Sequence, residues 1–365
     1  MERSVVATLL ERLDLDPPPN VRAHAPGGWG PKPGFGRDAA ALAGALLHYG
    51  LAAGQRVAVL GPAGTEWLQA GLAALLAGGT LVPLEGSLSD EIIRKALETT
   101  EAVQALAVDE RQLARLLAMR PDLPRLELVI LLTAAPSERK PAALTAESAA
   151  SVGREHLSRH PDCLKVGISA ASRGDACVFI NSEGRASTVS ASSLTRASSR
   201  IVDAIEARPG RSLLSTLRLA RYEGLALAIG SLARGVTLYV GNPDDLADTD
   251  LSRNPVDAVV LSERSLTQLF QAWNKDLETR SALKRAVARW ALRQGRSRQA
   301  SPWKRRLADR LVLKKLRRRL GGRVTRLDVI TPIRRDLSPD VKAFFESVGL
   351  PVRTHRLDGE SPLAR

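Results

Sequence analysis

The chain has 365 residues, of which 44% are hydrophobic and only 4% aromatic, so it can bury a large core of mostly Leu, Ala and Val and is long enough for two to three domain-sized units. The two cysteines and five scattered histidines exclude a disulfide framework and a Cys/His metal site. The sequence has no secretory signal and no apolar run long enough to span a membrane, so we expect a cytoplasmic protein and leave peripheral membrane contact open. The net charge of +14 is uneven, because 18 Lys and Arg and a single acid, Asp309, lie between Thr279 and Leu327, which gives this stretch +17 and the remainder about −3.

Residues 1–36 are predicted to form a loop-rich N-terminal segment. They end in PPPNVRAHAPGGWGPKPGFG, a run rich in Gly and Pro that is typical of a loop or linker. Gly28 and Gly30 in this run do not follow a predicted strand, so they give little support to a nucleotide-binding site. A helix is then expected over Ala39–Tyr49, with Asp38 as its N-cap and Gly50 at its end.

Residues 55–132 alternate regularly between predicted strands and helices. The clearest unit is a strand over Val57–Leu60, a Gly/Pro turn, a helix over Thr65–Leu76 and a strand over Thr80–Leu84. Such a βαβ unit implies a parallel sheet covered by helices. Further helices are predicted over Ser89–Thr99, with Ser89 as cap, and Arg111–Met119, and further strands over Val103–Val108 and Leu126–Leu132. The fold class is therefore α/β, and we expect two subdomains, 37–172 and 173–365, each a largely parallel sheet with helices on both faces.

The second subdomain opens with a pattern that resembles a phosphate site. A strand is predicted over Ala176–Ile180, and a helix is expected to start near Ser193. A strand, a loop and a helix start can direct backbone N–H groups and the helix dipole at one phosphate. However, the loop has one glycine, an acid that would face the phosphate and a single cation, which favours an ordinary connection; its residues are Asn181, Ser182, Glu183, Gly184 and Arg185.

The basic segment 280–326 has two interpretations, which remain open. Within Trp303–Leu320, an apolar stripe is predicted at Trp303, Leu307, Leu311 and Leu320, with Gly321-Gly322 as the stop. The helix could pack on the second sheet through that stripe and leave its cations in water. Alternatively, it could adsorb to an anionic membrane through Lys314, Lys315, Arg317, Arg318 and Arg319. Nucleic acid is the less favoured partner, because no helix-turn-helix, zinc or base-stacking pattern accompanies the charge.

Five short motifs follow one another in the first predicted subdomain: Gln55–Ala58, Glu66-Trp67, Ala77-Gly78, Val82–Leu84 and Leu88–Ile92. In this order they resemble the N-terminal region of AMP-forming acyl-CoA synthetases, members of the adenylate-forming superfamily. The resemblance extends over about residues 37–362 and includes Arg211–Gly241 and Leu311–Pro351, and the basic segment with Trp290 and Trp303 is most similar to the long-chain fatty-acid branch. It implies two flavodoxin- or Rossmann-like subdomains, a mobile C-terminal domain in the full enzymes, and chemistry that uses ATP and Mg²⁺.

The resemblance weakens where the family does its chemistry. Asn181, Ser182, Glu183, Gly184 and Arg185 stand in place of the family's longer Gly- and Thr-rich phosphate loop. Arg221 stands where the family has a histidine, and Arg334 and Arg335 replace the glycines that let adenine approach the backbone. Only Glu360 keeps its family identity, that of the glutamate that helps to hold Mg²⁺.

We therefore predict a truncated and catalytically inactive acyl-CoA-synthetase-like protein. The chain stops at Arg365, so the family's mobile C-terminal domain, with its catalytic lysine, is expected to be absent. No cofactor is expected, and ATP and Mg²⁺ would be used only if the family activity is retained. The predicted role is binding or scaffolding in acyl metabolism, with an acyl chain, an acyl carrier or a partner enzyme as partner. The alternative is an active fatty-acid or acyl-acid ligase that a separate C-terminal domain completes.

Overall fold

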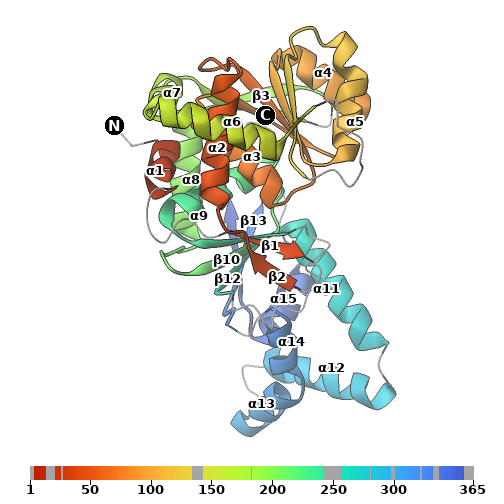
Figure 1. The fold of residues 1–365 in the computed structure, drawn as a ribbon. Helices are drawn as coiled ribbons and strands as arrows, with labels where there is room; N and C mark the ends of the chain where they lie inside the picture. The colour runs from red at the N-terminus through yellow and green to blue at the C-terminus, as the bar shows by residue number, and fades with distance from the viewer. Residues whose placement is uncertain are drawn as a thin grey trace.

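The computed structural model describes residues 4–13, 21–25, 28–133, 143–181, 183–241, 256–279, 281–296, 301–320, 323–331 and 337–356. These residues form two seven-stranded sheets flanked by helices, with a helical projection at the end remote from the first sheet (Figure 1). The predicted α/β class with two largely parallel sheets is confirmed.

The first sheet has the strand order β7-β6-β5-β3-β4-β8-β9, and all its neighbours are parallel except β8 and β9. Its strands are β3 (Arg56–Gly61), β4 (Thr80–Glu85), β5 (Gln104–Ala107), β6 (Leu128–Leu131), β7 (Leu144–Thr145), β8 (Asp175–Ile180) and β9 (Ala186–Ser190). The helices of this part are α2 (Phe35–His48), α3 (Thr65–Leu76), α4 (Asp90–Thr100), α5 (Glu110–Met119) with the 3₁₀ turn η1 (Arg120–Asp122), α6 (Ala146–Arg159) and α7 (Cys163–Ala171).

The second sheet has the order β14-β13-β12-β10-β11-β1-β2 and is parallel except for the pair β1–β2. Its strands are β1 (Val21–Ala25), β2 (Gly28–Pro31), β10 (Ser212–Ser215), β11 (Thr237–Val240), β12 (Ala258–Ser262), β13 (Leu327–Thr331) and β14 (Val352–Arg356). Its helices are α1 (Val5–Leu13), α8 (Ala191–Ala204), α9 (Tyr222–Arg234), α11 (Glu263–Glu278), α12 (Ala282–Arg296), α13 (Pro302–Ala308), the π-helical turn η3 (Asp309–Leu313), α14 (Lys314–Arg319) and α15 (Pro339–Val348).

Alternating side chains along each strand divide the interior into layers. Val57 and Val59 of β3 face a core that also holds Leu213 of β10, so the helices between the sheets, α3, α8 and α9 among them, share one core with both sheets. Ala58 and Leu60 face the opposite way, toward α4 and α5, and Leu214 faces α11 and α15. Strands covered on both faces are almost continuously apolar, which is why these runs are readable in the sequence.

Most predicted elements between residues 55 and 132 are confirmed. Helix α3 spans the predicted Thr65–Leu76, and Ser89 caps α4 by accepting a hydrogen bond from the Ile92 N–H. The predicted cap Asp38 is wrong: α2 begins at Phe35 after Gly34, whose φ of 76° is left-handed, and Asp38 lies in the first turn. There its charge still favours the helix N-terminus through the dipole.

The N-terminal 36 residues were predicted to be mainly loop, and this is wrong for much of the segment. The helix α1 and the strands β1 and β2 lie within it, and Gly28 therefore does follow a strand. Val21 pairs with Leu238 of β11, more than two hundred positions away in the chain. Pairing with β11 supplies hydrogen bonds that outweigh the low strand propensity of a Pro/Gly-rich stretch.

The sheets do not divide at residue 172. Strands β8 and β9 come from the range 173–365 but complete the first sheet, where Cys177 of β8 lies opposite Leu81 of β4. Conversely, β1 and β2, which precede residue 37, belong to the second sheet. The chain therefore crosses between the two sheets more often than the expected ranges imply.

The projection at the bottom of Figure 1 is built from α12, α13 and α14, which we call the basic arm, with the turn η3 between α13 and α14. Two of its cations fasten it to the body: Arg317 Nη1 donates to the Val348 carbonyl of α15 (2.7 Å), and Arg319 pairs with Asp276 of α11 (2.8 Å). Gly295 of α12 also lies so close to Ser347 that a methyl group there would overlap the Ser347 carbonyl. These contacts hold the arm against α11 and α15.

The apolar stripe predicted over Trp303–Leu320 is wrong in detail. Leu320 is buried, but Trp303, Leu307 and Leu311 are exposed to solvent. The π-helical turn is the physical reason, because its extra residue moves the buried face onto Ala308, Leu313, Leu316 and Leu320. The predicted stop at Gly321-Gly322 lies outside the described residues. No helix in the described part of the chain has the length and apolar character that crossing a bilayer requires.

Candidate functional site

A cavity of about 790 Å³ lies between the two sheets, where strands of both end. Gly61 and Glu85 are the last residues of β3 and β4, and Thr216 follows β10 directly, while Ser262 closes β12. All four lie at the carboxyl ends of parallel strands. In open α/β sheets these ends are where ligands bind, because the strands stop and loops fan out around a crevice.

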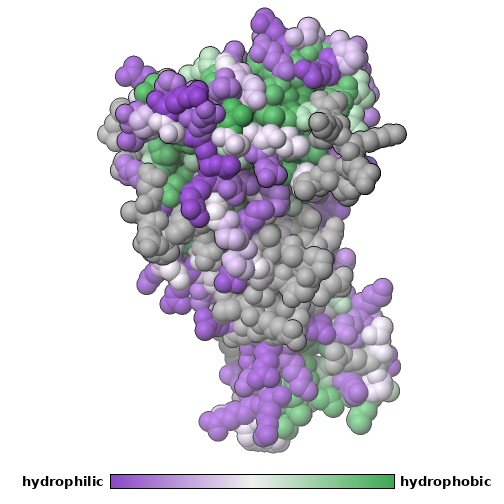
Figure 2. All heavy atoms as spheres, in the orientation of Figure 1, coloured by the Kyte–Doolittle hydropathy of each residue, from purple (hydrophilic) through white to green (hydrophobic). Residues whose placement is uncertain are grey.

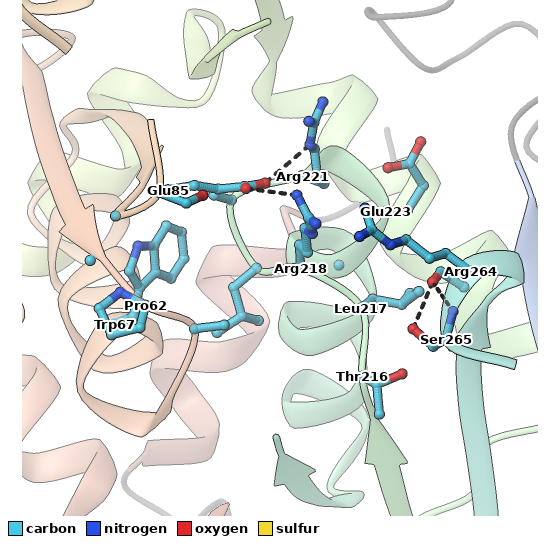
Figure 3. A pocket seen from close by; sticks show the side chains of 18 of the residues that line it. Pro62, Trp67, Glu85, Thr216, Leu217, Arg218, Arg221, Glu223, Arg264 and Ser265 are labelled. Atoms are coloured by element: carbon cyan, nitrogen blue, oxygen red, sulfur yellow. Dashed lines mark hydrogen bonds and ion pairs between the residues drawn. The ribbon is translucent and has the colours of Figure 1, made fainter. Parts of the chain in front are cut away.

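A three-residue ion pair crosses this cavity from one sheet to the other. Glu85, at the end of β4, accepts hydrogen bonds from Arg218 Nη1 at 2.8 Å and from Arg221 Nε at 3.2 Å (Figure 3). The carboxylate is largely shielded from solvent, whereas both guanidinium groups are partly exposed. Arg221, one of the predicted site residues, therefore joins the two sheets at the cavity wall.

The other charges around the cavity are less engaged. Asp109 is the N-cap of α5, where its carboxylate accepts the Gln112 N–H at 2.8 Å. Arg111 and Arg264 form no ion pair with any described residue, and both line the cavity. Figure 3 shows Arg264 at the start of α11, beside the residues that carry the bridge. The acid Glu223 also lines the cavity, and Arg111 and Arg264 are two cations there that could contact an anion.

Buried polar atoms in the cavity wall also lack partners. Trp67 and Thr216 are 1% and 2% exposed, and neither Trp67 Nε1 nor Thr216 Oγ1 has a hydrogen-bond partner among the described residues. Gln268 Oε1 is likewise unpaired. Buried polar groups in proteins are nearly always paired, so unpaired ones that border a cavity indicate where a ligand could donate or accept. The cavity thus combines cations, unpaired polar atoms and apolar wall residues such as Leu217 and Leu219.

The two side chains of the motif Glu66-Trp67 have different surroundings. Trp67 lines the cavity, whereas Glu66 is not among the lining residues and pairs with Lys32 Nζ at 3.0 Å. Burial alone would raise the pKa of Glu66, but hydrogen bonds from Lys32 and Thr65 and the charge of Lys32 outweigh burial, and the net effect lowers that pKa. Glu66 is therefore a structural anion that ties α3 to the segment after β2.

The predicted strand over Ala176–Ile180 and the helix start near Ser193 are confirmed as β8 and α8, which begins at Ala191 and is capped by Ser190. The predicted direct connection between them is wrong, because the strand β9 intervenes and pairs with β8 in the antiparallel direction. The sequence ASTVS reads as a Ser/Thr-rich helix approach, but pairing with β8 makes it a strand. The helix dipole of α8 is consequently not directed at the loop.

Hydrogen bonds within the β8–β9 turn occupy the N–H groups that a phosphate would need. Asn181 Oδ1 accepts from the N–H groups of Glu183 (2.9 Å) and Arg185 (2.8 Å), and the Asn181 carbonyl accepts from Gly184 N–H (3.0 Å). The Arg185 side chain pairs with Glu183 at 3.0 Å, and Gly184 takes a left-handed φ of 75°. The Asn181 carboxamide oxygen thus takes up two backbone N–H groups of the turn. These four residues do not line the cavity.

The remaining predicted site residues fall into two groups. Ser182, Arg334, Arg335 and Glu360 lie outside the described residues. Lys314, Lys315 and Arg318 are exposed on the basic arm, whereas Arg317 and Arg319 hold the arm to the body, and Arg317 also pairs with Asp309. The five cations predicted as one anion-binding set therefore have different structural roles.

Sequence reasoning missed most of the cavity. Glu85, Arg111, Thr216, Arg264 and Gln268 were not identified, although the first four lie at, or within four residues of, the end of a strand. Listing the polar residues that follow each predicted parallel strand would have found them. No group of three His, Cys, Asp or Glu residues in the described ranges could hold a metal ion.

The sequence of the chain is similar to those of known AMP-binding enzymes. Residues 35–348 match the family described as AMP-binding enzyme. The chain is 24% identical to the long-chain-fatty-acid–CoA ligase ACSBG2 of Xenopus laevis, over 84% of this chain and 44% of that protein, so it spans less than half of the relative's length.

Solved structures share the fold at low sequence identity. The acetoacetyl-CoA synthetase of Streptomyces lividans superposes with a TM-score of 0.67 at 14% identity, over 98% of this chain and 52% of that one. An acyl-CoA synthetase of Brucella canis gives 0.65 at 16% identity, over 97% and 57%. Identities this low establish the fold alone. The fold expected from the motif resemblance, that of the N-terminal domain of adenylate-forming enzymes, is confirmed.

Proposed function

Since the chain belongs to the AMP-binding enzyme family, as an acyl-CoA-synthetase-like member, we propose that it binds an acyl ligand without adenylating it. The observation that carries this proposal is the β8–β9 turn, whose N–H groups are engaged by Asn181. A role in binding or scaffolding follows, with an acyl chain, an acyl carrier or a partner enzyme as its partner.

The chemistry of the turn supports the loss of adenylation. A phosphate oxygen would have to displace Asn181 Oδ1 from the N–H groups of Glu183 and Arg185. It would also meet the Glu183 carboxylate and an arginine already paired with it. Each charge-assisted hydrogen bond that phosphate cannot form forfeits roughly 1.5–3 kcal/mol. The described residues of the turn do not fit the phosphates of ATP, so we infer no use of ATP or Mg²⁺.

The cavity supports retention of acyl binding. Arg111 and Arg264 offer charge to a carboxylate or to another acidic head group, and Leu217, Leu219 and Ile330 offer apolar wall. The bridge from Glu85 to Arg218 and Arg221 holds the two sides of the cavity together without using those two cations. A fatty or aryl acid has both of the required parts, an anion and an apolar body.

Two assays test the proposal. The first measures ATP–pyrophosphate exchange across fatty and aryl acids with Mg²⁺, and we expect no acid-dependent exchange. The second measures displacement of a fluorescent fatty acid, and we expect binding that Arg264→Gln weakens about tenfold by removing one charge-assisted hydrogen bond. The control Arg125→Gln removes an exposed arginine outside the cavity and should leave binding unchanged. Acid-dependent exchange, or micromolar affinity for ATP in calorimetry, would overturn the proposal.

A second candidate is an active AMP-forming acyl-acid or fatty-acid ligase that a separate C-terminal domain completes. It is favoured by the cation-lined cavity at the strand ends, which could hold the acid substrate of such a ligase. Adding a stand-alone C-terminal domain from a neighbouring gene should then produce acid-dependent exchange, and no gain would exclude this candidate.

The cytoplasm is the location that we propose, together with reversible contact between the basic arm and a membrane surface.

A further inference from the structure

Four large apolar side chains are exposed on the basic arm: Leu283 lies in α12, and the other three lie in α13 and the turn η3. Trp303, Leu307 and Leu311 are 61%, 41% and 43% exposed and follow one another at intervals of four residues, and we call them the apolar patch. Residues four apart lie on one side of a helix, so the three side chains are neighbours. Six large apolar residues are exposed in the described part of the chain, and three of them form this patch.

The backbone conformation of the arm, and not poor packing, exposes the apolar patch. Between Ala308 and Leu313, both buried, the π-helical turn adds one residue, and the buried face continues through Leu316 and Leu320. The arm can therefore satisfy its own core while it keeps the apolar patch in solvent. Arg317 and Arg319 attach the arm to α15 and α11, so the patch belongs to a segment that is held to the body.

Unpaired cations surround the apolar patch. Arg306, Arg310, Lys314, Lys315 and Arg318 are exposed and form no ion pair with a described residue. Lys304 Nζ lies 5.6 Å from the centre of the Trp303 ring. Asp309, the one acid of this stretch, forms an ion pair with Arg317. Hydrophilic residues cover much of the projecting arm in Figure 2, with hydrophobic residues between them.

We propose that the basic arm docks on the surface of an anionic phospholipid bilayer. The apolar patch enters the boundary between head groups and acyl chains, and the surrounding cations contact lipid phosphates. An exposed Trp beside Leu and several cations is the pattern of an interfacial helix, in which the indole ring lies at the head-group level. The phosphates of a nucleic acid would bind the cations, but they would not remove the exposed leucines from water. The arm projects from the body, so a flat membrane can reach it (Figure 1).

The test is flotation of the full chain with vesicles of phosphatidylcholine alone and of phosphatidylcholine with 30% phosphatidylglycerol. We expect binding to the anionic vesicles only, and loss of that binding as the Debye length shrinks to about 3 Å at 1 M salt. The triple variant Lys314→Gln/Lys315→Gln/Arg318→Gln should weaken binding about 100-fold at low salt, because each cation near an anionic surface favours adsorption roughly fivefold.

A matched control removes the same charge elsewhere. Arg125→Gln/Arg154→Gln/Arg173→Gln changes three exposed arginines outside the arm and should leave vesicle binding within about twofold of the wild type, since the charges lie away from the bilayer. If both triple variants weaken binding equally, net charge alone explains it and the proposal is overturned.

The apolar patch has its own test. Leu307→Gln/Leu311→Gln should weaken binding at least about tenfold, because two apolar side chains no longer leave water. The control Leu283→Gln changes an apolar residue of α12 that is 76% exposed and outside the patch, and it should have little effect. Brominated acyl chains should quench the fluorescence of wild-type protein, and Trp303→Phe should remove most of that quenching. Unchanged binding by the leucine variant, equal binding to neutral vesicles, or tighter binding to duplex DNA than to anionic vesicles would each overturn docking of the patch.

Discussion

Single side chains join the two sheets at the cavity. Glu85 closes β4 of the first sheet, while Arg218 and Arg221 follow β10 of the second, and the three form the bridge that crosses between them. The arginine at position 221 looks like the loss of a family histidine when the sequence is read alone. In the structure it has gained a partner, so its role is at least partly structural.

Glu85→Gln should lower the free energy of unfolding by about 1 kcal/mol. The carboxylate is well shielded, but Arg218 and Arg221 are partly exposed, so solvent screening reduces the value of the bridge. The control is Glu98→Gln, which breaks an exposed pair with Arg94 and should cost almost nothing. Urea denaturation of both variants measures the difference, and equal losses would show that the bridge is an ordinary surface pair.

Glu206 makes stability depend on pH in the acid range. Hydrogen bonds from Arg326 and then Arg353 lower the pKa of Glu206 from 4.5 to about 2. A carboxylate with a lowered folded-state pKa stabilises the fold above its unfolded pKa, and that contribution is lost as the pH falls through the folded pKa. The stability difference between wild type and Glu206→Gln should therefore be constant above about pH 5 and vanish near about pH 2.

Denaturation of both proteins at each pH measures this difference. The control Glu127→Gln removes an exposed carboxylate that forms no ion pair with a described residue, and its difference from wild type should be small throughout. If the two variants show the same pH dependence, the link to Arg326 and Arg353 is refuted.

Asn181 organises the β8–β9 turn through its carboxamide. Asn181→Ala should lower the free energy of unfolding by about 1 kcal/mol, because the N–H groups of Glu183 and Arg185 exchange a protein acceptor for water. Asn181→Asp keeps an oxygen acceptor and should restore most of that loss. Thermal melts compare the three proteins, and an Asp variant as unstable as the Ala variant would contradict the assigned hydrogen bonds.

At the scale of elements, backbone contact decides where helices can meet. Helices α2 and α6 touch through Gly44 and Gly153, and a methyl group at position 153 would overlap the Ala41 carbonyl. This contact covers the outer side of α2, and α2 in turn closes the core between the sheets. A glycine within a helix usually weakens it, so its presence here has a packing reason.

Gly153→Ala should destabilise the protein by roughly 2 kcal/mol, although alanine is the better helix former, because the two backbones must separate. The control is Gly174→Ala, where the nearest atom that the methyl group would meet, the Ala171 carbonyl oxygen, is 3.6 Å away. That variant should be close to neutral. Chemical denaturation decides between them, and a stabilised Gly153→Ala protein would show that the helices can separate at no cost.

The whole molecule should unfold as one unit, because a single core contains residues of both sheets and of the helices between them. Calorimetry should therefore give one transition whose van 't Hoff and calorimetric enthalpies agree. Gly153→Ala, located in the first half of the chain, should shift that whole transition to lower temperature. Two separate transitions, of which the variant moves only one, would contradict a shared core.

The sequence alone determined the fold class and much of its first half. The βαβ unit over residues 56–85 and the cap at Ser89 are readable because strands buried on both faces are continuously apolar and because caps are local hydrogen bonds. The family motifs Glu66-Trp67 and Val82–Leu84 lie in that same unit and were recognised with it.

Only the tertiary structure decided the rest. The pairing of β1 with β11 and the bridge from Glu85 to Arg221 join residues that lie far apart in the chain and carry no local signal of their contact. The strands β8 and β9 are consecutive, but the Ser/Thr-rich residues of β9 do not indicate a strand on their own. The π-helical turn places Ala308 and Leu313 against Ala291 of α12, and it changed which apolar residues of the basic arm are buried. Local propensities differ by only about 1 kcal/mol per residue, so partners that are distant in the chain override them. The candidate sites lie where those distant partners meet.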